Sequence, residues 1–272
     1  MNPESVNAYY SSMVSDSKSK SIIIWGIHPV REVLEICSDD CQRLFVHPSF
    51  GKKKAQAGLL RLAERHEVLV ERAEDFKSTG VPAGTVHQGV AALVRPVWSI
   101  DFSSLPLYWR DKRPLVVVCD QVTDPQNVGA IVRSSVALGA QAVLLPSRRT
   151  CWITGAVAKS SSGALFHIKV CQVGNLVTAM RQLKEMGLWI AGLSPDGEHP
   201  LWELDLNRPL ALVVGAEGTG LRRLVKETCD FLARIPHFGP VGSMNVASAA
   251  SIALYEVARQ RNLSPVYTGI RR

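Results

Sequence analysis

The sequence predicts an α/β protein with two domains, and three observations lead to this prediction. Short apolar runs of strand length alternate with amphipathic helical stretches along most of the chain. The run at 115–119 is apolar throughout, which is typical of a strand buried in a parallel sheet. Residues 98–113 contain Trp and Pro and show neither the helical nor the strand period of apolar residues. This stretch separates two blocks of alternating strands and helices, so we predict a linker there.

The first block, residues 21–97, is expected to be a small N-terminal α/β domain. Its apolar patterns predict strands at 22–25, 43–47, 67–71 and 89–95, and helices at 28–36 and 52–66. Lys52, Lys53 and Lys54 open the second helix. Most charge runs are only solvated helix faces, but in a basic chain we interpret these lysines as part of an RNA-binding surface.

The second block, residues 114–272, is expected to form a parallel sheet from successive βαβ units. Asp124 before Pro125 is a helix-start signal, and Gly139 ends that helix. Further helices are expected at 156–165 and 175–186, near 221 and from 246 to the last turn around Arg261. Strands are predicted at 115–119, 142–145, 167–171, 188–193 and 209–214.

Composition and net charge indicate which kinds of molecule the protein binds and which kinds of site it lacks. The 272 residues carry a net charge of +7 with a pI near 9.2, which favours a polyanion over an acidic partner. The six cysteines form no C-x-x-C pair, which favours reduced thiols in a cytoplasmic protein and no metal site. No apolar run is long enough to span a membrane, and residues 1–20 are interpreted as a disordered tail.

Three polar loops follow predicted strands or precede predicted helices, at 120–127, 215–220 and 236–245. Loops at the carboxyl ends of parallel strands are where α/β proteins bind ligands. The glycine-rich loop around Glu217 lacks the G-K-[ST] of a Walker A motif, and Arg223 stands where a Rossmann motif has its third glycine. Classical nucleoside-triphosphate and dinucleotide sites are therefore disfavoured.

The segments D-P-Q-N-V-G-A-I-V-R-S, L-V-V-G-A-E-G-T-G-L and I-P-H-F-G-P-V-G-S-M-N-V-A-S-A-A-S-I-A-L-Y-E occur in this order. Together they resemble the three signature motifs of the SpoU (TrmH-type) RNA 2′-O-methyltransferases of the SPOUT superfamily. The first block, with G-I-H-P-V-R-E-V-L-E and V-H-Q-G-V-A-A, resembles the RNA-binding domain of the 23S rRNA guanosine-2′-O-methyltransferase subgroup.

The resemblance implies a homodimeric enzyme that uses S-adenosyl-L-methionine (AdoMet), with a trefoil knot in the catalytic domain and sites near the dimer interface. The implied catalytic residues are Asn127, Arg133, Glu217, Ser243 and Asn245. The implied cofactor-binding residues are Gly215, Gly218, Ile235, Met244 and Asn245. Arg133 is also expected to contact the RNA, in addition to Lys52, Lys53 and Lys54.

The family proposal makes Arg133 the general base. Because a guanidinium group is almost never deprotonated, Arg133 is alternatively expected to stabilise the developing alkoxide and grip a phosphate. Charge balance predicts a cation beside Glu217. Two other functions stay open: a tRNA 2′-O-methyltransferase, and an inactive RNA-binding ribosome-assembly factor. The presence of Arg133, Glu217 and Asn245 disfavours the inactive protein.

Overall fold

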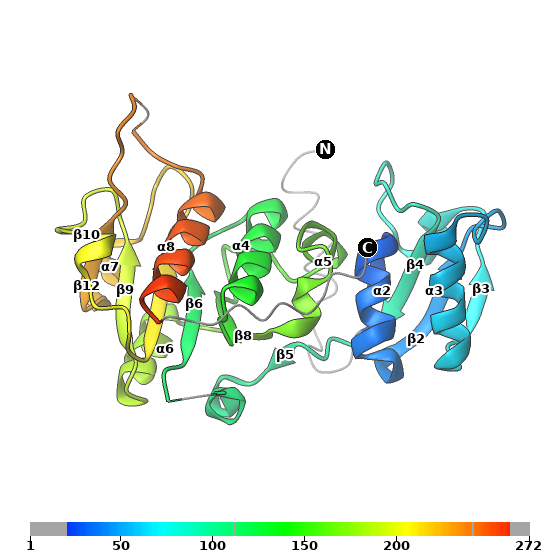
Figure 1. Ribbon diagram of the computed structural model, residues 1–272, viewed down its shortest axis with the longest axis horizontal. Coiled ribbons are helices and arrows are strands. Elements are labelled where there is room, and N and C mark those ends of the chain that lie inside the picture. The colour runs from blue at the N-terminus through cyan, green and yellow to red at the C-terminus, as the bar shows by residue number, and fades with distance from the viewer. Residues whose placement is uncertain (1–20, 111, 241, 262–272) are drawn as a thin grey trace. The chain divides into compact units, whose positions relative to one another are not determined.

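The computed structural model describes residues 21–110, 112–240 and 242–261 (Figure 1). The predicted tail at 1–20 lies outside these residues. The chain forms two compact units: unit 1 contains the chain up to Trp98 together with residues 153–166, and unit 2 contains the remainder. Residues 153–166 therefore pack with a unit that is far from them in sequence.

Unit 1 is built on a small mixed sheet with the strand order β1-β4-β2-β3 in the described residues. The strands are β1 (Ile22–Trp25), β2 (Cys41–Val46), β3 (Val70–Arg72) and β4 (Val90–Val94). Strands β1 and β2 run antiparallel to β4, and β3 runs parallel to β2. Alternation of side chains along each strand gives the sheet two faces.

One face of this sheet is covered by α2 (Ile27–Ile36) and α3 (Lys54–Arg65), which bury the apolar stripe that the sequence predicts. The buried members of the stripe are Val30, Val33, Leu34, Leu59 and Ala63. Two short 3-10 helices, η1 (Ser38–Asp40) and η2 (Phe76–Thr79), complete the part of unit 1 before Trp98.

The other face is partly covered by α5 (Gly155–Ser160), which packs against β1. A Cβ atom on Gly155 would lie 2.1 Å from the Trp25 ring and 2.2 Å from the carbonyl oxygen of Ile23. Only glycine permits so close an approach of helix to strand. The next 3-10 helix, η4 (Ala164–His167), contributes Phe166, whose ring meets that of Trp98 edge to face.

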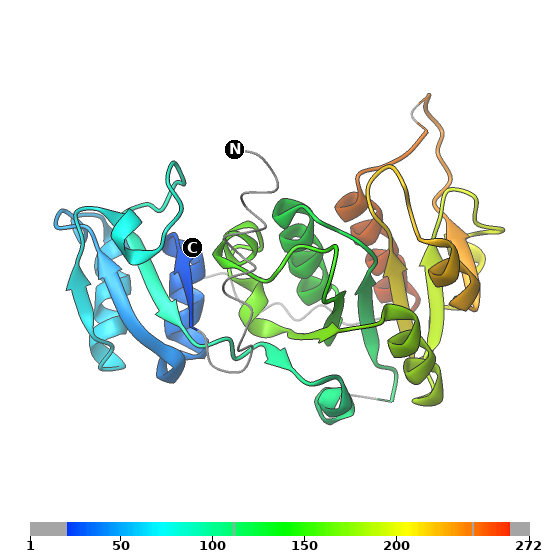
Figure 2. The same cartoon turned by 180° about the vertical axis from the view of Figure 1, so that it is seen from behind.

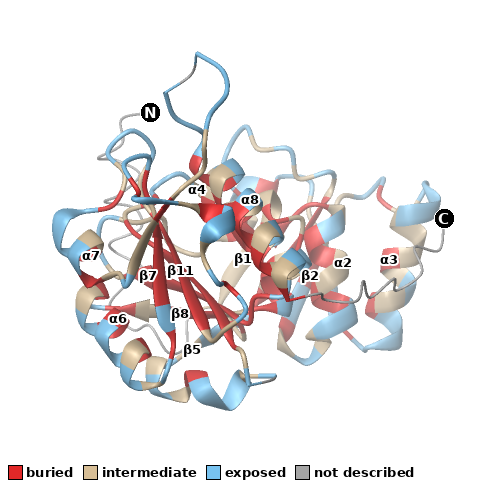
Figure 3. Ribbon diagram, turned by 60° about the vertical axis from the view of Figure 1, so that its left-hand side comes forward, coloured by how far each residue is buried: buried red, intermediate tan, exposed pale blue. Residues whose placement is uncertain are grey.

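Unit 2 contains a sheet of eight parallel strands in its described residues, in the order β10-β12-β9-β11-β6-β7-β8-β5. The strands are β5 (Ser99–Ile100), β6 (Leu115–Cys119), β7 (Ala142–Pro146), β8 (Lys169–Val173), β9 (Trp189–Leu193), β10 (His199–Pro200), β11 (Leu210–Val214) and β12 (Phe231–Arg234). The central strands are buried throughout (Figure 3).

Helices cover both faces of this sheet. Helices α6 (Leu176–Glu185) and α7 (Arg223–Thr228) pack on one face and share its apolar core (Figure 2). On the other face α4 (Pro125–Ala137) packs against α8 (Val246–Gln260), and the hydroxyls of Ser134 and Ser251 lie 2.7 Å apart between them. Two 3-10 helices, η3 (Phe102–Tyr108) and η5 (Leu201–Glu203), lie in the connections.

The predicted fold class, an α/β protein with a parallel-sheet C-terminal domain and a small N-terminal α/β domain, is confirmed. Strand β12 was not among the predicted strands because its run is only four residues long, with partly exposed ends. The aperiodic stretch after Trp98 also supplies an edge strand, β5, which pairs with β8. Within the same stretch Trp109 packs partly buried against the core of unit 2.

Candidate active site

The three polar loops lie at one edge of the large sheet. Strands β12, β9, β11 and β6 are consecutive neighbours and parallel, so the chain leaves all four at the same edge. The loop after β6 leads to α4, the loop after β11 holds the glycine-rich stretch, and the loop after β12 leads to α8. This is the edge at which open α/β sheets bind ligands.

The glycine-rich loop folds back on itself. Ala216 and Gly220 exchange two backbone hydrogen bonds, of 3.2 and 2.9 Å, which bring the two ends of the loop together. A Cβ atom on Gly215 would lie 2.3 Å from the carbonyl carbon of Gly220, so no side chain fits there. The sequence marks this loop as tight, and the structure gives the reason for its first glycine.

An ion pair between buried Asp120 and partly exposed Arg222 anchors the far end of this loop. The carboxylate of Asp120, fully buried at the end of β6, accepts hydrogen bonds from the backbone N–H of Arg222 at 2.9 Å and from its Nε at 2.7 Å. The first and second motif loops are thereby joined. Sequence reasoning missed both residues, although a charged residue directly after an all-apolar strand is a signal that could have found Asp120.

Asn245 is the N-cap of α8 and determines the orientation of two further side chains. Its Oδ1 accepts hydrogen bonds from the backbone N–H groups of Ala247 at 2.9 Å and Ser248 at 3.2 Å. Because the amide oxygen is used in this way, the amide nitrogen is directed outward, where Nδ2 donates to Oδ1 of Asn127 at 2.8 Å.

Asn127 in turn orients the side chain of Glu217. The Nδ2 group of Asn127 donates to Oε2 of Glu217 at 3.2 Å, so each amide accepts through oxygen and donates through nitrogen. The sequence led us to expect a cation beside Glu217. In the described residues its hydrogen-bond partner is instead the neutral amide of Asn127. Three of the predicted catalytic residues thus form one hydrogen-bonded chain.

Beside this chain lies a pocket lined by four of the predicted cofactor-binding residues, Gly215, Gly218, Ile235 and Met244. Glu217 and Ser243, from the predicted catalytic set, also line it. The walls are mostly apolar, with Leu193, Val214, Val246 and Ala249 among the other members. His237 lines the pocket as well and was not singled out from the sequence.

Arg133 lies outside this group. It is exposed on α4, six residues beyond Asn127, and is not among the described residues that line the pocket. Six residues correspond to roughly 9 Å along a helix and place the two side chains on different sides of it. In unit 1, Lys52, Lys53 and Lys54 are all exposed, at the start of α3.

Among the described residues there is no cluster of three or more His, Cys, Asp or Glu side chains that could hold a metal ion. None of the six cysteines forms a disulfide bond with another described residue. Burial is the main cause that raises the pKa of Cys119, Cys171 and Cys229 to about 12. No helix in the described part of the chain has the length and apolar character needed to cross a bilayer.

Two family models match the chain. Residues 114–255 match the SpoU rRNA methylase family, and residues 23–97 match the substrate-binding domain of RNA 2′-O ribose methyltransferases. The first match covers most of unit 2, with all three motif loops, and also the residues 153–166 that pack in unit 1.

Individual relatives agree with these models. A 23S rRNA (guanosine-2′-O-)-methyltransferase of Pseudomonas putida is 36% identical over 242 residues, which are 88% of this chain and 97% of that protein. A protein of Staphylococcus saprophyticus, named as a TrmH family tRNA/rRNA methyltransferase, is 37% identical over 245 residues, with 89% and 97% covered.

Among solved structures, the SpoU methyltransferase AviRb of Streptomyces viridochromogenes superposes with a TM-score of 0.72 at 26% identity, covering 89% of this chain and 90% of that one. The fold, the three motif loops and these matches agree with the resemblance seen in the sequence. The chain belongs to the SpoU rRNA methylase family, a family of methyltransferases.

Proposed function

We propose that this protein transfers a methyl group from AdoMet to a ribose 2′-hydroxyl of a guanosine in 23S-type rRNA. The observation that carries the proposal is the hydrogen-bonded chain from Asn245 through Asn127 to Glu217 beside the pocket of the glycine-rich loop. The relative from Pseudomonas putida, named as a 23S rRNA guanosine-2′-O-methyltransferase, supports the choice of RNA and of nucleotide.

The lining of the pocket suits AdoMet chemically. At Gly215 the loop is too tight for a side chain, so backbone is exposed to a ligand at that point. Apolar walls from Leu193, Ile235 and Met244 suit an adenine ring and a methionine chain. Gly215, Gly218, Ile235 and Met244 would hold AdoMet, which supplies an electrophilic methyl group. Solved SpoU-type structures of 22–23% identity contain AdoMet and share this fold.

In the proposed reaction, residues of this protein orient the nucleotide and stabilise the charge that develops on the 2′-oxygen. In such a transfer the bond from the ribose 2′-oxygen to the methyl carbon would form in line as the S–C bond of AdoMet breaks, S-adenosylhomocysteine would leave, and the hydroxyl proton would pass to solvent. Orientation and charge control therefore dominate the reaction. The chain through Asn127 holds the Glu217 carboxylate beside the pocket, where it orients the nucleotide together with the Ser243 hydroxyl. Arg133 stabilises the developing alkoxide and grips a neighbouring phosphate.

RNA binding is assigned to unit 1, which carries the substrate-binding match, and to Arg133. Lys52, Lys53 and Lys54 stand at the N-terminus of α3, where the helix dipole disfavours cations. Since these lysines do not serve the stability of the helix, contact with phosphate explains their position. A tRNA substrate is the alternative, and mapping of the product decides between the two RNAs.

A homodimer is part of the proposal. Ile252 and Tyr255 on α8 are 40% and 61% exposed, one turn apart on the side of the helix that faces away from the core. Exposed apolar side chains of this size on a helix are typical of a protein interface.

A trefoil knot and a cytoplasmic location complete the proposal. Strand β12 lies beyond β9, whereas α8, which follows it, packs on α4, so the chain has to cross the ends of β9 and β11. Such a crossing, threaded through the loop before it, would make the knot. The three buried cysteines, Cys41, Cys119 and Cys171, form no disulfide bond, which fits the reducing cytoplasm.

Mapping of ribose methylation tests the function. Large-subunit rRNA and tRNA are purified separately from cells with and without the protein; mass spectrometry of their nucleosides identifies the modification, and resistance of the RNA to alkaline cleavage locates it in the sequence. We expect 2′-O-methylguanosine to disappear from one position of the large-subunit rRNA. A methyl group on the base would contradict the reaction type, and a ribose methyl lost only from tRNA would contradict the choice of RNA.

A further inference from the structure

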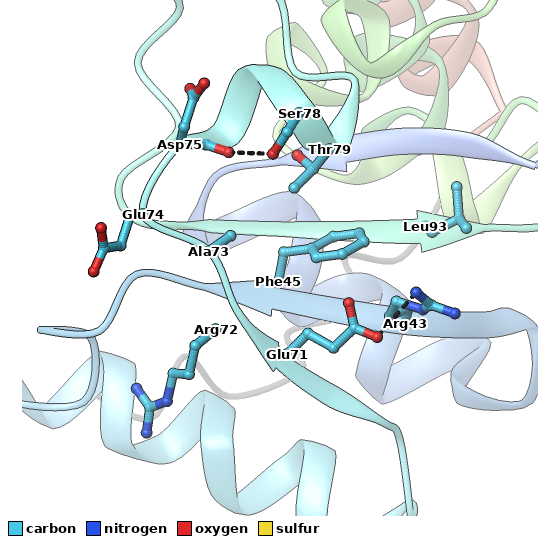
Figure 4. Close-up of a pocket in the computed structure, with 10 residues that line it drawn as sticks. All are labelled: Arg43, Phe45, Glu71, Arg72, Ala73, Glu74, Asp75, Ser78, Thr79 and Leu93. Atoms are coloured by element: carbon cyan, nitrogen blue, oxygen red, sulfur yellow. Dashed lines mark hydrogen bonds and ion pairs between the residues drawn. The ribbon is translucent and has the colours of Figure 1, made fainter.

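A second pocket, of about 490 Å³, lies wholly within unit 1, on the sheet face away from α2 and α3 (Figure 4). Its volume falls in the range of about 300–1,000 Å³ that is typical of small-ligand sites. Pairing of the strands explains its floor. Phe45 lies between Ala91 and Glu71, and Arg43 lies beside Leu93, all on one face of the sheet.

Helix α5 covers only one end of this face. Ala156 packs on the cluster around Trp25 and Phe76, over β1 and β4. Toward β2 and β3 the face is open, and Phe45 and Leu93 are only partly buried. Figure 4 shows the Phe45 ring at the centre of the pocket, with Ser78 and Thr79 on one side and Arg43 and Glu71 on the other. A partly exposed aromatic ring is thus available to a flat ligand.

The polar groups around this ring are mainly acceptors. The Ser78 hydroxyl donates to the carbonyl of Asp75 and the Thr79 hydroxyl donates to the carbonyl of Phe76, both at 2.7 Å. Their lone pairs remain for a ligand. The guanidinium of Arg43 is paired with Glu71 at 2.9 Å, and one ion pair leaves the carboxylate further acceptor sites.

The charged groups differ in their orientation. Glu71 lies beside the Phe45 ring, whereas the carboxylates of Glu74 and Asp75 point away from it in Figure 4, and Oδ1 of Asp75 accepts from the backbone N–H of Lys77 at 2.9 Å. Arg72 is directed to the backbone carbonyls of His47 and Pro48, at 3.5 and 3.4 Å. With Arg43 already paired, the groups left beside the ring are the Glu71 carboxylate and two hydroxyl oxygens, which disfavour a phosphate because a phosphate brings only acceptors and negative charge. The favoured ligand is a flat ring that presents several N–H donors.

We propose that this pocket binds an unpaired guanine base of the substrate RNA, stacked on Phe45 and read by Glu71. The proposal rests on the proposed function, which makes RNA the ligand of unit 1. The Watson–Crick edge of guanine carries N1–H and an exocyclic amino group side by side, matching the two oxygens of a carboxylate. Unpaired bases are recognised in this way, by stacking on an aromatic side chain and by hydrogen bonds to the exposed edge.

The test uses the full chain saturated with S-adenosylhomocysteine, so that the pocket at the glycine-rich loop is already filled. Labelled decamers of uridine with one central guanosine, inosine or adenosine are titrated by fluorescence anisotropy at fixed salt. Inosine lacks only the exocyclic amino group of guanosine. We expect the guanosine decamer to bind about tenfold more tightly than the other two.

Two variants and a control locate the effect. Glu71→Gln should remove the preference for guanosine, and Phe45→Leu, which keeps an apolar side chain, should weaken all three decamers about tenfold. Glu64→Gln, an exposed change on α3, should alter neither result. Thermal melting checks that each variant is folded. Glu71→Gln keeps the test decisive if Phe45→Leu does not fold.

Equal binding of the three decamers by the wild type, or a guanosine preference that survives Glu71→Gln, would overturn the proposal. Binding of an arginine-rich peptide to this pocket in place of any decamer would reassign it to a protein partner and would also overturn it. These measurements do not involve methyl transfer. A wild type that prefers guanosine but methylates no RNA would therefore refute the proposed function and leave the guanine site standing.

Discussion

At the scale of single residues, Asn245 performs two tasks with one side chain. Its oxygen caps α8, and its nitrogen aligns Asn127, which in turn holds Glu217. The helix cap therefore determines which atom of each amide faces its neighbour. The carboxylate at the end of the chain keeps a defined place without a cation beside it in the described residues.

Exchanging Asn245 for aspartate separates these tasks. Asn245→Asp keeps an oxygen for the cap, so the free energy of unfolding should change by less than about 0.5 kcal/mol. Its second oxygen would face Oδ1 of Asn127, acceptor against acceptor, and the alignment of Glu217 should be lost. We expect single-turnover methyl transfer to fall about 100-fold.

Asn245→Ala is the matched control for that exchange. It removes the cap as well, so about 1 kcal/mol of stability should be lost in addition to the activity. Thermal melting and single-turnover rates are measured on both variants. Asn245→Asp with a wild-type rate would mean that the hydrogen-bonded chain has no part in the reaction.

Arg133 gives a second prediction at this scale. Because it does not line the pocket in the single chain, Arg133→Ala should leave the affinity for S-adenosylhomocysteine unchanged in calorimetry. Methyl transfer should fall by about 10²–10³-fold if the guanidinium stabilises the alkoxide. Arg133→Lys keeps the charge but loses the planar fork, and should recover only part of the rate. Retention of most of the rate in Arg133→Ala would make this residue structural.

At the scale of elements, the site depends on the glycine-rich loop, which is held closed at both ends. Ala216 and Gly220 close the glycine-rich loop through the backbone, and the ion pair between Asp120 and Arg222 ties its exit to β6. The glycine-rich loop is short and follows a buried strand, so its backbone groups are fixed before a ligand arrives. Binding then costs little ordering of the protein.

Gly215→Ala tests this closure. The added Cβ would lie 2.3 Å from backbone carbon of Gly220, and backbone cannot move aside as the end of a side chain can. We expect a loss of about 1–3 kcal/mol of stability and a clear loss of affinity for S-adenosylhomocysteine. Gly239→Ala, in the neighbouring loop, meets nothing within 4 Å and should be neutral. Differential scanning calorimetry and titration calorimetry measure the two effects.

The start of α3 gives another prediction at this scale. The affinity for RNA is expected to fall as salt rises. Replacing Lys52, Lys53 and Lys54 by glutamine should make the plot of log affinity against log salt less steep, by up to about 0.9 for each lysine that contacts a phosphate. The melting temperature should not fall, because three cations are removed from the positive end of the helix dipole. Lys112→Gln, exposed in unit 2, is the control. An unchanged salt slope would remove these lysines from the RNA-binding surface.

At the scale of the whole molecule, the compact units do not follow the order of the chain. The SpoU match includes residues 153–166, yet these residues pack in unit 1, where Gly155 lies against Trp25 and Phe166 meets Trp98. The pocket of the glycine-rich loop belongs entirely to unit 2.

Deletion of residues 1–97 tests this division into two units. The shortened chain should still bind S-adenosylhomocysteine in calorimetry, since every residue that lines the pocket remains. Residues 153–166 lose the partners that bury Val157, Ala158 and Leu165, so a protease should cut there first. Methyl transfer to RNA should be strongly reduced. A shortened chain that resists cleavage in this segment and methylates RNA normally would contradict the prediction.

The sequence by itself determined the fold class, most of the strands and helices, and the family. Alternating apolar periods are local, and strands such as β6 and helices such as α4 can be read from a few neighbouring residues. The motif residues could be named in the same way, because their identities stand in the sequence. Their catalytic and cofactor-binding roles stay predictions.

Only the tertiary structure decided how these residues meet. The hydrogen bonds from Asn127 to Glu217 and from Asn245 to Asn127 join positions 90 and 118 residues apart. The pairing of Asp120 with Arg222, the place of β12 beside β9 and the packing of 153–166 in unit 1 also join segments that are not neighbours in sequence. Such contacts follow from strand order and chain crossing, which no local period encodes, so they appear only when the chain is folded.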